Sequence, residues 1–113
     1  HRFESREKEV SAFVRLLNTT AQDLGVPMLV LAQMNRAIES RAGADPRLSD
    51  LRECGDIEND AFSVMFPLMP SPNDIIANNG VAPTKFIIAK HRGGKVGFIN
   101  MQWHAACVRF LEA

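Results

Sequence analysis

A helical pattern passes directly into a short apolar run, and this junction constrains the fold more than any other feature of the sequence. Apolar residues recur at helical spacing across residues 6–24, which predicts an amphipathic helix. The stripe comprises Val10, Phe13, Val14, Leu17, Ala21 and Leu24. Gly25 suits the left-handed position that ends many helices. Residues 26–32, VPMLVLA, predict a strand buried on both faces, so we expect an α/β fold with a mostly parallel sheet.

The composition is that of one small soluble domain. The chain has 113 residues, of which 46% are apolar and 23% are charged. Lys and Arg number 13, as do Asp and Glu, so net charge gives no indication of a nucleic-acid partner. No apolar run approaches the roughly 20 residues of a membrane helix, and we expect no membrane partner. Cys54 and Cys107 are expected to be reduced thiols in the cytoplasm.

Between the apolar segments lies a polar stretch, residues 46–61, PRLSDLRECGDIENDA. It belongs to a loop that we expect to run from about residue 35 to residue 60, and loops of that length are usually functional or disordered. Arg52 and Glu53 stand close to Gly55, which places a guanidinium, a carboxylate and a glycine backbone within a few residues. Polar loops between buried strands often carry binding residues, although a solvated connection has the same composition.

The carboxyl end of the predicted strand 26–32 is a second candidate site. In parallel α/β sheets, ligands bind at the carboxyl ends of the strands. Gln33, Asn35 and Arg36 follow the strand and offer amide and guanidinium donors to a phosphate. The alternative is that Gln33 only anchors a loop.

The second half of the chain alternates in the manner of strands. Residues 62–69 predict a strand that Pro67 shortens or confines to an edge, and residues 70–84 predict a loop. Residues 85–103 predict an antiparallel ribbon with a basic, glycine-rich turn at 91–95. The turn either presents its cations to a phosphate or only aids solubility. Residues 108–112 are a last short strand or a frayed tail.

Three segments together resemble one family. LAQMNR at 31–36, LSDLRECGDIENDA at 48–61 and IIAKHRGGKVG at 87–97 are similar, in order and spacing, to the last three motifs of the DnaB-type replicative DNA helicases. The resemblance covers nearly the whole chain. It implies a hexameric ring with a RecA-like ATPase core that uses ATP and Mg²⁺ to move along single-stranded DNA. It also implies neighbouring subunits as partners and the cytoplasm of a bacterial or phage-infected cell as the location.

The resemblance implies roles toward nucleotide for three residues. Gln33 matches a glutamine that couples the γ-phosphate to the DNA-binding loops. Lys90 and Arg92 match a pair that reaches across the subunit interface to a neighbour's nucleotide, with Arg92 as the arginine finger. An arginine suits that role because its rigid fork stays charged and takes two phosphate oxygens.

The resemblance also implies a DNA site in the polar stretch. Arg52, Glu53 and Gly55 match a loop whose side chains and backbone amides hold the DNA phosphate chain. The sequence departs from the commoner family pattern without losing these residues. The departures are Cys54, Phe62, His91 and Gly94.

A larger departure concerns the phosphate loop. The sequence contains no GxxxxGK[ST] motif and no acidic residue that closes a Walker B strand. Residues 1–113 are therefore expected to be the second half of a RecA-like helicase ATPase domain. By itself, such a chain is expected to hold no ATP or Mg²⁺ and to be inactive as an enzyme.

Three other hypotheses stay open. The chain could be a non-catalytic, truncated RecA-like module that binds or regulates a helicase. It could be a RecA-like relative with a different function, such as a recombinase or a clock-type ATPase, although the stretch from Asp50 to Asp60 favours the helicases. His104 and Cys107, with His91 and Cys54, could bind zinc, but a single H-x-x-C is a weak signal and we expect no metal.

Overall fold

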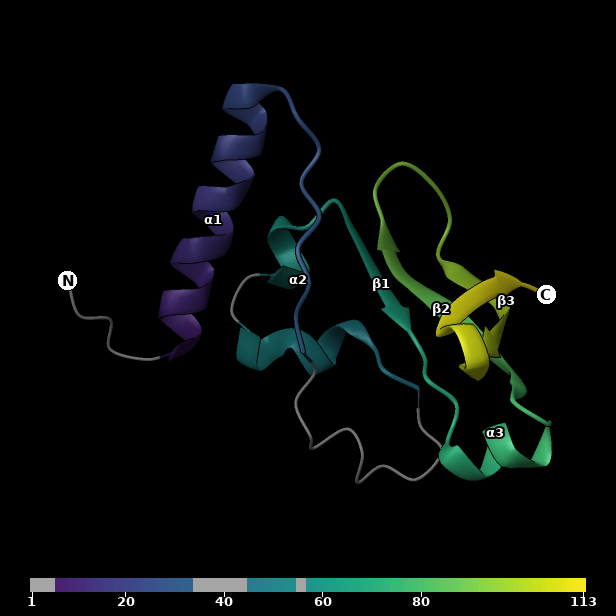
Figure 1. Ribbon diagram of the computed structural model, residues 1–113. Coiled ribbons are helices and arrows are strands. Elements are labelled where there is room, and N and C mark those ends of the chain that lie inside the picture. Colours follow the sequence, from purple (N-terminus) through teal and green to yellow (C-terminus); the bar gives the residue numbers. More distant parts are fainter. Residues whose placement is uncertain (1–5, 34–44, 55–56) are drawn as a thin grey trace. The chain divides into compact units, whose positions relative to one another are not determined.

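The structure is a computed structural model that describes residues 6–33, 45–54 and 57–113 (Figure 1). The chain divides into two units, residues 1–62 and residues 63–113, and each is described here by itself. The first unit contains α1 (Arg6–Leu24), η2 (Leu48–Cys54) and α2 (Ile57–Asp60). The second contains β1 (Ser63–Pro67), α3 (Pro72–Ala77), β2 (Val81–His91), β3 (Gly97–His104), η3 (Ala105–Cys107) and β4 (Arg109–Glu112).

Helix α1 confirms the prediction for residues 6–24. Gly25 follows with φ +64, and its N–H donates to the carbonyl of Gln22 at 3.2 Å. The N–H of Val26 donates to the carbonyl of Ala21 at 3.1 Å, which completes a Schellman ending. Four residues of the predicted stripe are half-buried, whereas Phe13 and Leu24 are exposed.

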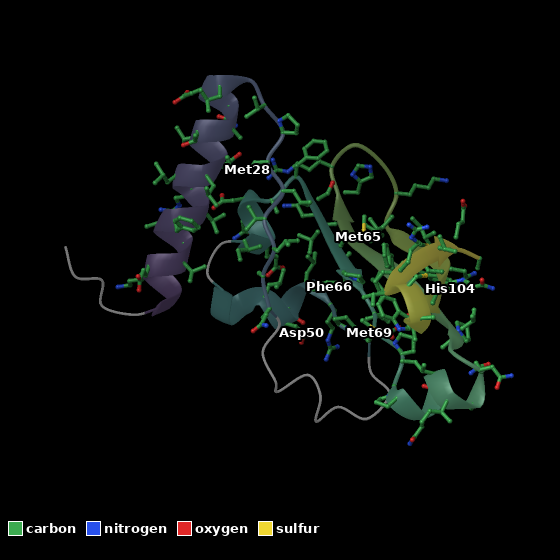
Figure 2. The ribbon with its side chains drawn as sticks, in the orientation of Figure 1. Met28, Asp50, Met65, Phe66, Met69 and His104 are labelled. Carbon is green, nitrogen blue, oxygen red and sulfur yellow. The ribbon has the colours of Figure 1, made fainter. Side chains whose placement is uncertain are left out.

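Residues 26–33 form no strand, so the strand predicted for 26–32 is not found. Leu29 and Leu31 are 89% and 88% exposed, and Met28 lies in the same stretch (Figure 2). A buried strand needs hydrogen-bonding neighbours, and the described strands pair only with one another. Every described pairing is antiparallel, so the prediction of a mostly parallel sheet does not hold for these residues either.

The polar stretch is more ordered than the loop that was predicted for it. Seven residues form the 3₁₀ helix η2 and four form α2, and both contact α1. Leu51 is only 4% exposed and is the apolar residue that fixes η2. The prediction missed η2 because one buried leucine among charged residues gives no periodic signal.

The sheet of the second unit has the order β1-β2-β3-β4. β2 and β3 pair antiparallel from Val81↔His104 to Ile88↔Gly97, which confirms the ribbon predicted for 85–103. β1 lies at one edge and ends at Pro67, as that proline indicated. Of the two alternatives for residues 108–112, β4 shows the short strand and not the frayed tail.

The loop predicted for residues 70–84 is wrong at both of its ends. Ser71 caps α3 by accepting the N–H of Asp74 at 3.1 Å, and Pro72 occupies the first turn. β2 begins at Val81 and includes Pro83. The pairing of β1 reaches only Phe86 along β2, so Pro83 has a strand neighbour on one side alone. A proline, which lacks an N–H, is tolerated at such an edge position.

Aromatic rings form the core of the second unit. Phe110 packs edge-on against Phe86, with centroids 4.9 Å apart, and against Trp103 at 4.7 Å. The buried apolar residues of the unit are Val64, Phe66, Ala82 and Trp103. This core holds the four strands together and thereby fixes the base of the β2–β3 hairpin.

Candidate functional site

The basic turn lies at the end of β2, beyond the part that pairs with β3. Pairing between β2 and β3 stops at Ile88↔Gly97. β2 continues for three more residues, and there its partner is β1, with Val64↔Lys90 and Ser63↔His91. The loop that joins β2 to β3 therefore begins from residues that β1 holds (Figure 1).

A β-bulge sets the direction of these last residues. Val64 pairs with Lys90, but its neighbour Met65 pairs with Ile88, so Ala89 is an extra residue on β2. A bulge of this kind reverses which face the following side chains occupy. Without it, Lys90 would stand opposite Ser63. With it, His91 takes that place.

His91 is fixed on two sides. Its Nδ1 shares a hydrogen bond of 2.8 Å with the Ser63 hydroxyl across the β1–β2 pair. Its carbonyl accepts the N–H of Gly94 at 3.3 Å, which closes the turn over residues 91–94. A Cβ on Gly94 would lie 2.8 Å from Cδ2 of the imidazole, so the ring and residue 94 are in close contact.

The second unit carries an excess of positive charge that the balanced whole chain conceals. Residues 63–113 contain five cationic side chains but only two carboxylates. The cations are Lys85, Lys90, Arg92, Lys95 and Arg109, and the carboxylates are Asp74 and Glu112. Four of the five cations lie on the β2–β3 hairpin, with Arg92 exposed and Lys90 half-buried. This hairpin is suited to an anionic ligand such as a phosphate.

Lys85 marks the middle of the same hairpin. Its Nζ lies 5.2 Å from the centroid of the Phe98 ring, within range of a cation–π contact. Phe98 is itself 60% exposed, so the contact stands at the surface of the ribbon. Positive charge therefore continues along β2 from its middle to its end.

The remaining predicted site residues lie in the first unit. Gln33 is exposed at the end of the irregular segment that follows α1. Arg52 and Glu53 belong to the last turn of η2, and Gly55 lies outside the described residues. The structure thus brings Lys90 and Arg92 together on one hairpin but tests none of the roles predicted for these residues.

Asp50 shows how η2 begins. Its Oδ2 accepts the backbone N–H of Arg47 at 2.8 Å, and its own N–H donates to the carbonyl of Arg47 at 2.9 Å. Asp50 lies in η2 (Figure 2), where this reciprocal pair orders the start of the helix. The helix then carries the chain to Arg52 and Glu53.

His104 and Cys107, the weak candidates for a zinc site, lie at the end of β3 and in η3. The Cys107 thiol contacts the backbone carbonyl of His104 at 3.8 Å, and Nε2 of His104 (Figure 2) is buried without a hydrogen-bond partner. Within residues 6–33, 45–54 and 57–113, no group of three or more His, Cys, Asp or Glu residues could hold a metal ion. No helix among the described residues is both long and apolar enough to span a bilayer.

Ser63 and Ala89 were not identified from the sequence. Ala89 lies within the motif at 87–97, but nothing in that motif marks a bulge, and the pairing of Ser63 with His91 depends on a shift in register. A bulge at an alanine leaves no mark in an alternating apolar run. The only sequence signal was His91 itself, which departs from the commoner family pattern.

Comparison with known proteins agrees with the motif resemblance. Residues 1–112 match the family described as DnaB-like helicase C terminal domain. The replicative DNA helicase DnaB of Leifsonia xyli is 40% identical over 111 residues, which cover 98% of this chain and 24% of that protein. The DnaB of Mycobacterium leprae is 38% identical, and the match covers 96% of this chain and 18% of that protein. The chain thus spans about a quarter or less of these two relatives.

Solved structures show the same likeness. One of them, described as an ATPase domain, superposes with a TM-score of 0.83 at 31% identity, covering 100% of this chain and 39% of that one. Another is a DnaB-like replicative helicase, described together with its interactions with primase. It superposes with a TM-score of 0.82 at 30% identity, covering 100% of this chain and 27% of that one. With the family match over residues 1–112, these findings establish that the chain belongs to the DnaB-like helicase C-terminal domain family.

Proposed function

We propose that this chain is the second half of a RecA-like ATPase domain in an ATP-dependent replicative DNA helicase that assembles as a hexameric ring. In the ring it supplies an arginine finger to a neighbouring subunit and a loop that holds single-stranded DNA. The observation that carries the proposal is the hairpin end, where Lys90 and Arg92 stand at the end of a paired strand and Arg92 is exposed. A cationic tip on such a strand is suited to reach the phosphates of a neighbouring subunit's nucleotide.

The hairpin geometry supports a role for Arg92 in phosphoryl transfer. The side chain is exposed, and the strand before it is paired with β1 up to His91, so its base is rigid. A guanidinium held in this way offers two parallel N–H groups to phosphate oxygens. Arg92 would stabilise negative charge that develops on the transferred phosphoryl group, and Lys90 would add a second cation nearby.

The hairpin and Gln33 are proposed to act on ATP separately, each from its own unit. The cations of the hairpin suit the phosphates of a neighbour's ATP, and Gln33 offers an amide to a γ-phosphate. ATP, with Mg²⁺, would supply the phosphoryl group whose transfer drives movement.

The DNA-binding part of the proposal rests on the polar stretch. Arg52 and Glu53 lie in the last turn of η2, and the buried side chain of Leu51 fixes the helix immediately before them. A short helix anchored in this way can present the following backbone amides to a phosphate chain. We propose that Arg52, Glu53 and Gly55 hold single-stranded DNA, with Arg52 making the charged contact.

Mixed rings test the arginine finger. Complete subunits that carry residues 1–113 are prepared with Arg92 or with Arg92→Ala, and steady-state ATP hydrolysis is measured as the mutant fraction rises. Fully mutant rings should lose on the order of a thousandfold in kcat while nucleotide affinity falls much less, because the contact acts mainly in the transition state. Arg92→Lys should not restore the rate, since an ammonium cannot take two oxygens in one plane.

Mixing separates the two hypotheses. A second mixture places Arg92→Ala subunits beside subunits that carry Arg92 but have an inactivated phosphate loop. If Arg92 acts on a neighbour, the two inactive variants should recover activity together, because an intact phosphate loop can then meet an intact finger. If Arg92 acts within its own subunit, every site in the mixture stays defective. Unchanged hydrolysis would remove Arg92 from the nucleotide site and favour the non-catalytic interaction module.

A further inference from the structure

We infer that His91, held between Ser63 and Gly94, is a positioning residue that fixes the direction of Arg92. The inference rests on the proposed function of Arg92 and extends it to three residues that do not touch the nucleotide. His91 is the last residue of β2, and Arg92 is the first residue of the turn. Whatever fixes the main chain and ring of His91 therefore fixes the starting point of the arginine side chain.

Ser63 provides the first constraint. Its hydroxyl and Nδ1 of His91 lie 2.8 Å apart, and both residues are register partners of the β1–β2 pair. Both side chains reach the same face only because Ala89 bulges out of β2. The bulge and the hydrogen bond thus form one arrangement, in which the imidazole is anchored to the neighbouring strand just before the turn.

Gly94 provides the second constraint. Its N–H closes the turn onto the His91 carbonyl at 3.3 Å, and a Cβ at this position would lie 2.8 Å from Cδ2 and 3.1 Å from Nε2 of the ring. The φ of Gly94 lies outside the left-handed region, so the backbone itself would accept alanine. An alanine at residue 94 would therefore meet the imidazole, which would have to shift to make room for it.

The two constraints act on opposite sides of one ring. Ser63 holds the imidazole from the strand, while the turn folds Gly94 against its Cδ2 edge. Arg92 lies between His91 and Gly94 in sequence, inside the closed turn of residues 91–94. Displacement of the ring would rotate the turn and move the guanidinium from a productive position, and an error of about 1 Å in such a group can cost on the order of a hundredfold in rate.

A matched pair of substitutions at Ser63 tests the first constraint in the complete ring. Ser63→Ala removes the hydroxyl from an exposed strand position, whereas Ser63→Thr keeps it and adds a methyl that strands accept. Ser63→Ala should lower kcat for ATP hydrolysis about tenfold, which corresponds to roughly one lost hydrogen bond. KM and single-stranded-DNA affinity should change less than about twofold, and Ser63→Thr should stay within about twofold of wild type.

A double-mutant cycle tests the second constraint. Gly94→Ala should lower kcat in the wild-type background, because the new Cβ pushes the imidazole aside. In the His91→Ala background the same change should have no further effect, because no ring remains to be displaced. Equal effects of Gly94→Ala in both backgrounds would show that residue 94 acts without His91 and would overturn the inference.

Arg92→Ala, measured in parallel, separates the failure of this inference from the failure of the proposed function. If Arg92→Ala leaves hydrolysis intact, the proposed function itself is wrong. If Arg92→Ala abolishes hydrolysis while Ser63→Ala matches wild type, or while Ser63→Thr is as slow as Ser63→Ala, the proposed function stands and the positioning role is refuted. The positioning role further requires that the double variant, Ser63→Ala with Arg92→Ala, have the same kcat as Arg92→Ala alone.

Discussion

The rings of Trp103 and Phe110 pack at a tilt of 54°, with their centroids 4.7 Å apart. The two residues are also register partners of the β3–β4 pair. β4 has four residues, and Phe110 is the one among them that also reaches the Phe86 ring on β2. One side chain therefore ties the last strand both to its neighbour and to the centre of the sheet.

Phe110→Ala should destabilise the second unit by about 2 kcal/mol, less than a fully buried phenylalanine would cost because Phe110 is only half-buried. Trp103 is the sole tryptophan and is 8% exposed, so its fluorescence reports unfolding in urea. Phe98→Ala is the matched control, since it removes the same ring from a site that is 60% exposed. A control loss as large as that of Phe110→Ala would contradict the role assigned to the aromatic core.

Val108 offers a stabilising change. It has φ 51 and ψ 56, a left-handed conformation that costs a β-branched residue roughly 1 to 2 kcal/mol. Its side chain is 74% exposed, so little burial would be lost on substitution. Val108→Asn should raise the free energy of unfolding by about 1 kcal/mol, because asparagine adopts this conformation more readily.

The control for Val108 is Val96→Asn. Val96 is 63% exposed, and among the described residues only Asn79 and Val108 combine a side chain with a positive φ. The same substitution at an ordinary backbone conformation should therefore bring no gain in the urea midpoint. A gain at residue 96 equal to that at residue 108 would show that solvation of asparagine, and not relief of backbone strain, is responsible.

Local signals predicted the elements whose hydrogen bonds join residues that are close in sequence. The stripe of α1 and the glycine that ends it gave the bounds Arg6–Leu24, and two alternating runs around a glycine pair gave the β2–β3 ribbon. In each case the hydrogen-bonding partner lies a few residues away or directly across a turn. Such pairings can be inferred from spacing and turn chemistry alone.

Elements that depend on distant partners were missed or misplaced. The apolar run 26–32 indicated burial on both faces, but the described strands give it no neighbour, and Leu29 and Leu31 stay exposed. The bulge at Ala89 follows from how β1 meets β2, which no pattern within β2 records. Helix α3 is different, because Ser71, Pro72 and Asp74 are a recognisable start signal that the three prolines of residues 70–84 obscured.

The same distinction applies to the candidate site. Lys90 and Arg92 were identified from a motif, and their shared position at the end of β2 could be anticipated from the hairpin. The Ser63–His91 hydrogen bond could not, because it joins residues 28 apart through a shifted register. The charge excess of residues 63–113 was present in the sequence but was cancelled in the total for the whole chain.

Arg52→Ala tests the proposed DNA contact. In complete rings it should weaken single-stranded-DNA binding and reduce the slope of log K against log salt by about 0.7, the change expected when one phosphate contact is lost from a single strand. ATP affinity should be little changed, because the contact is to DNA. Binding is measured by fluorescence anisotropy of a labelled oligonucleotide at several salt concentrations.

Arg47→Ala is the control that separates a direct phosphate contact from a general effect of charge. Arg47 is exposed and lies five residues before Arg52, and the bond that it gives to Asp50 comes from its backbone N–H, which alanine retains. Both variants lose one positive charge from the same short segment, so a general electrostatic effect would lower affinity in both. A direct phosphate contact predicts that the slope falls for Arg52→Ala alone. Equal slopes in the two variants and the wild type would remove η2 and the residues after it from the DNA site, while a fall shared by both variants would reduce the role of Arg52 to its charge.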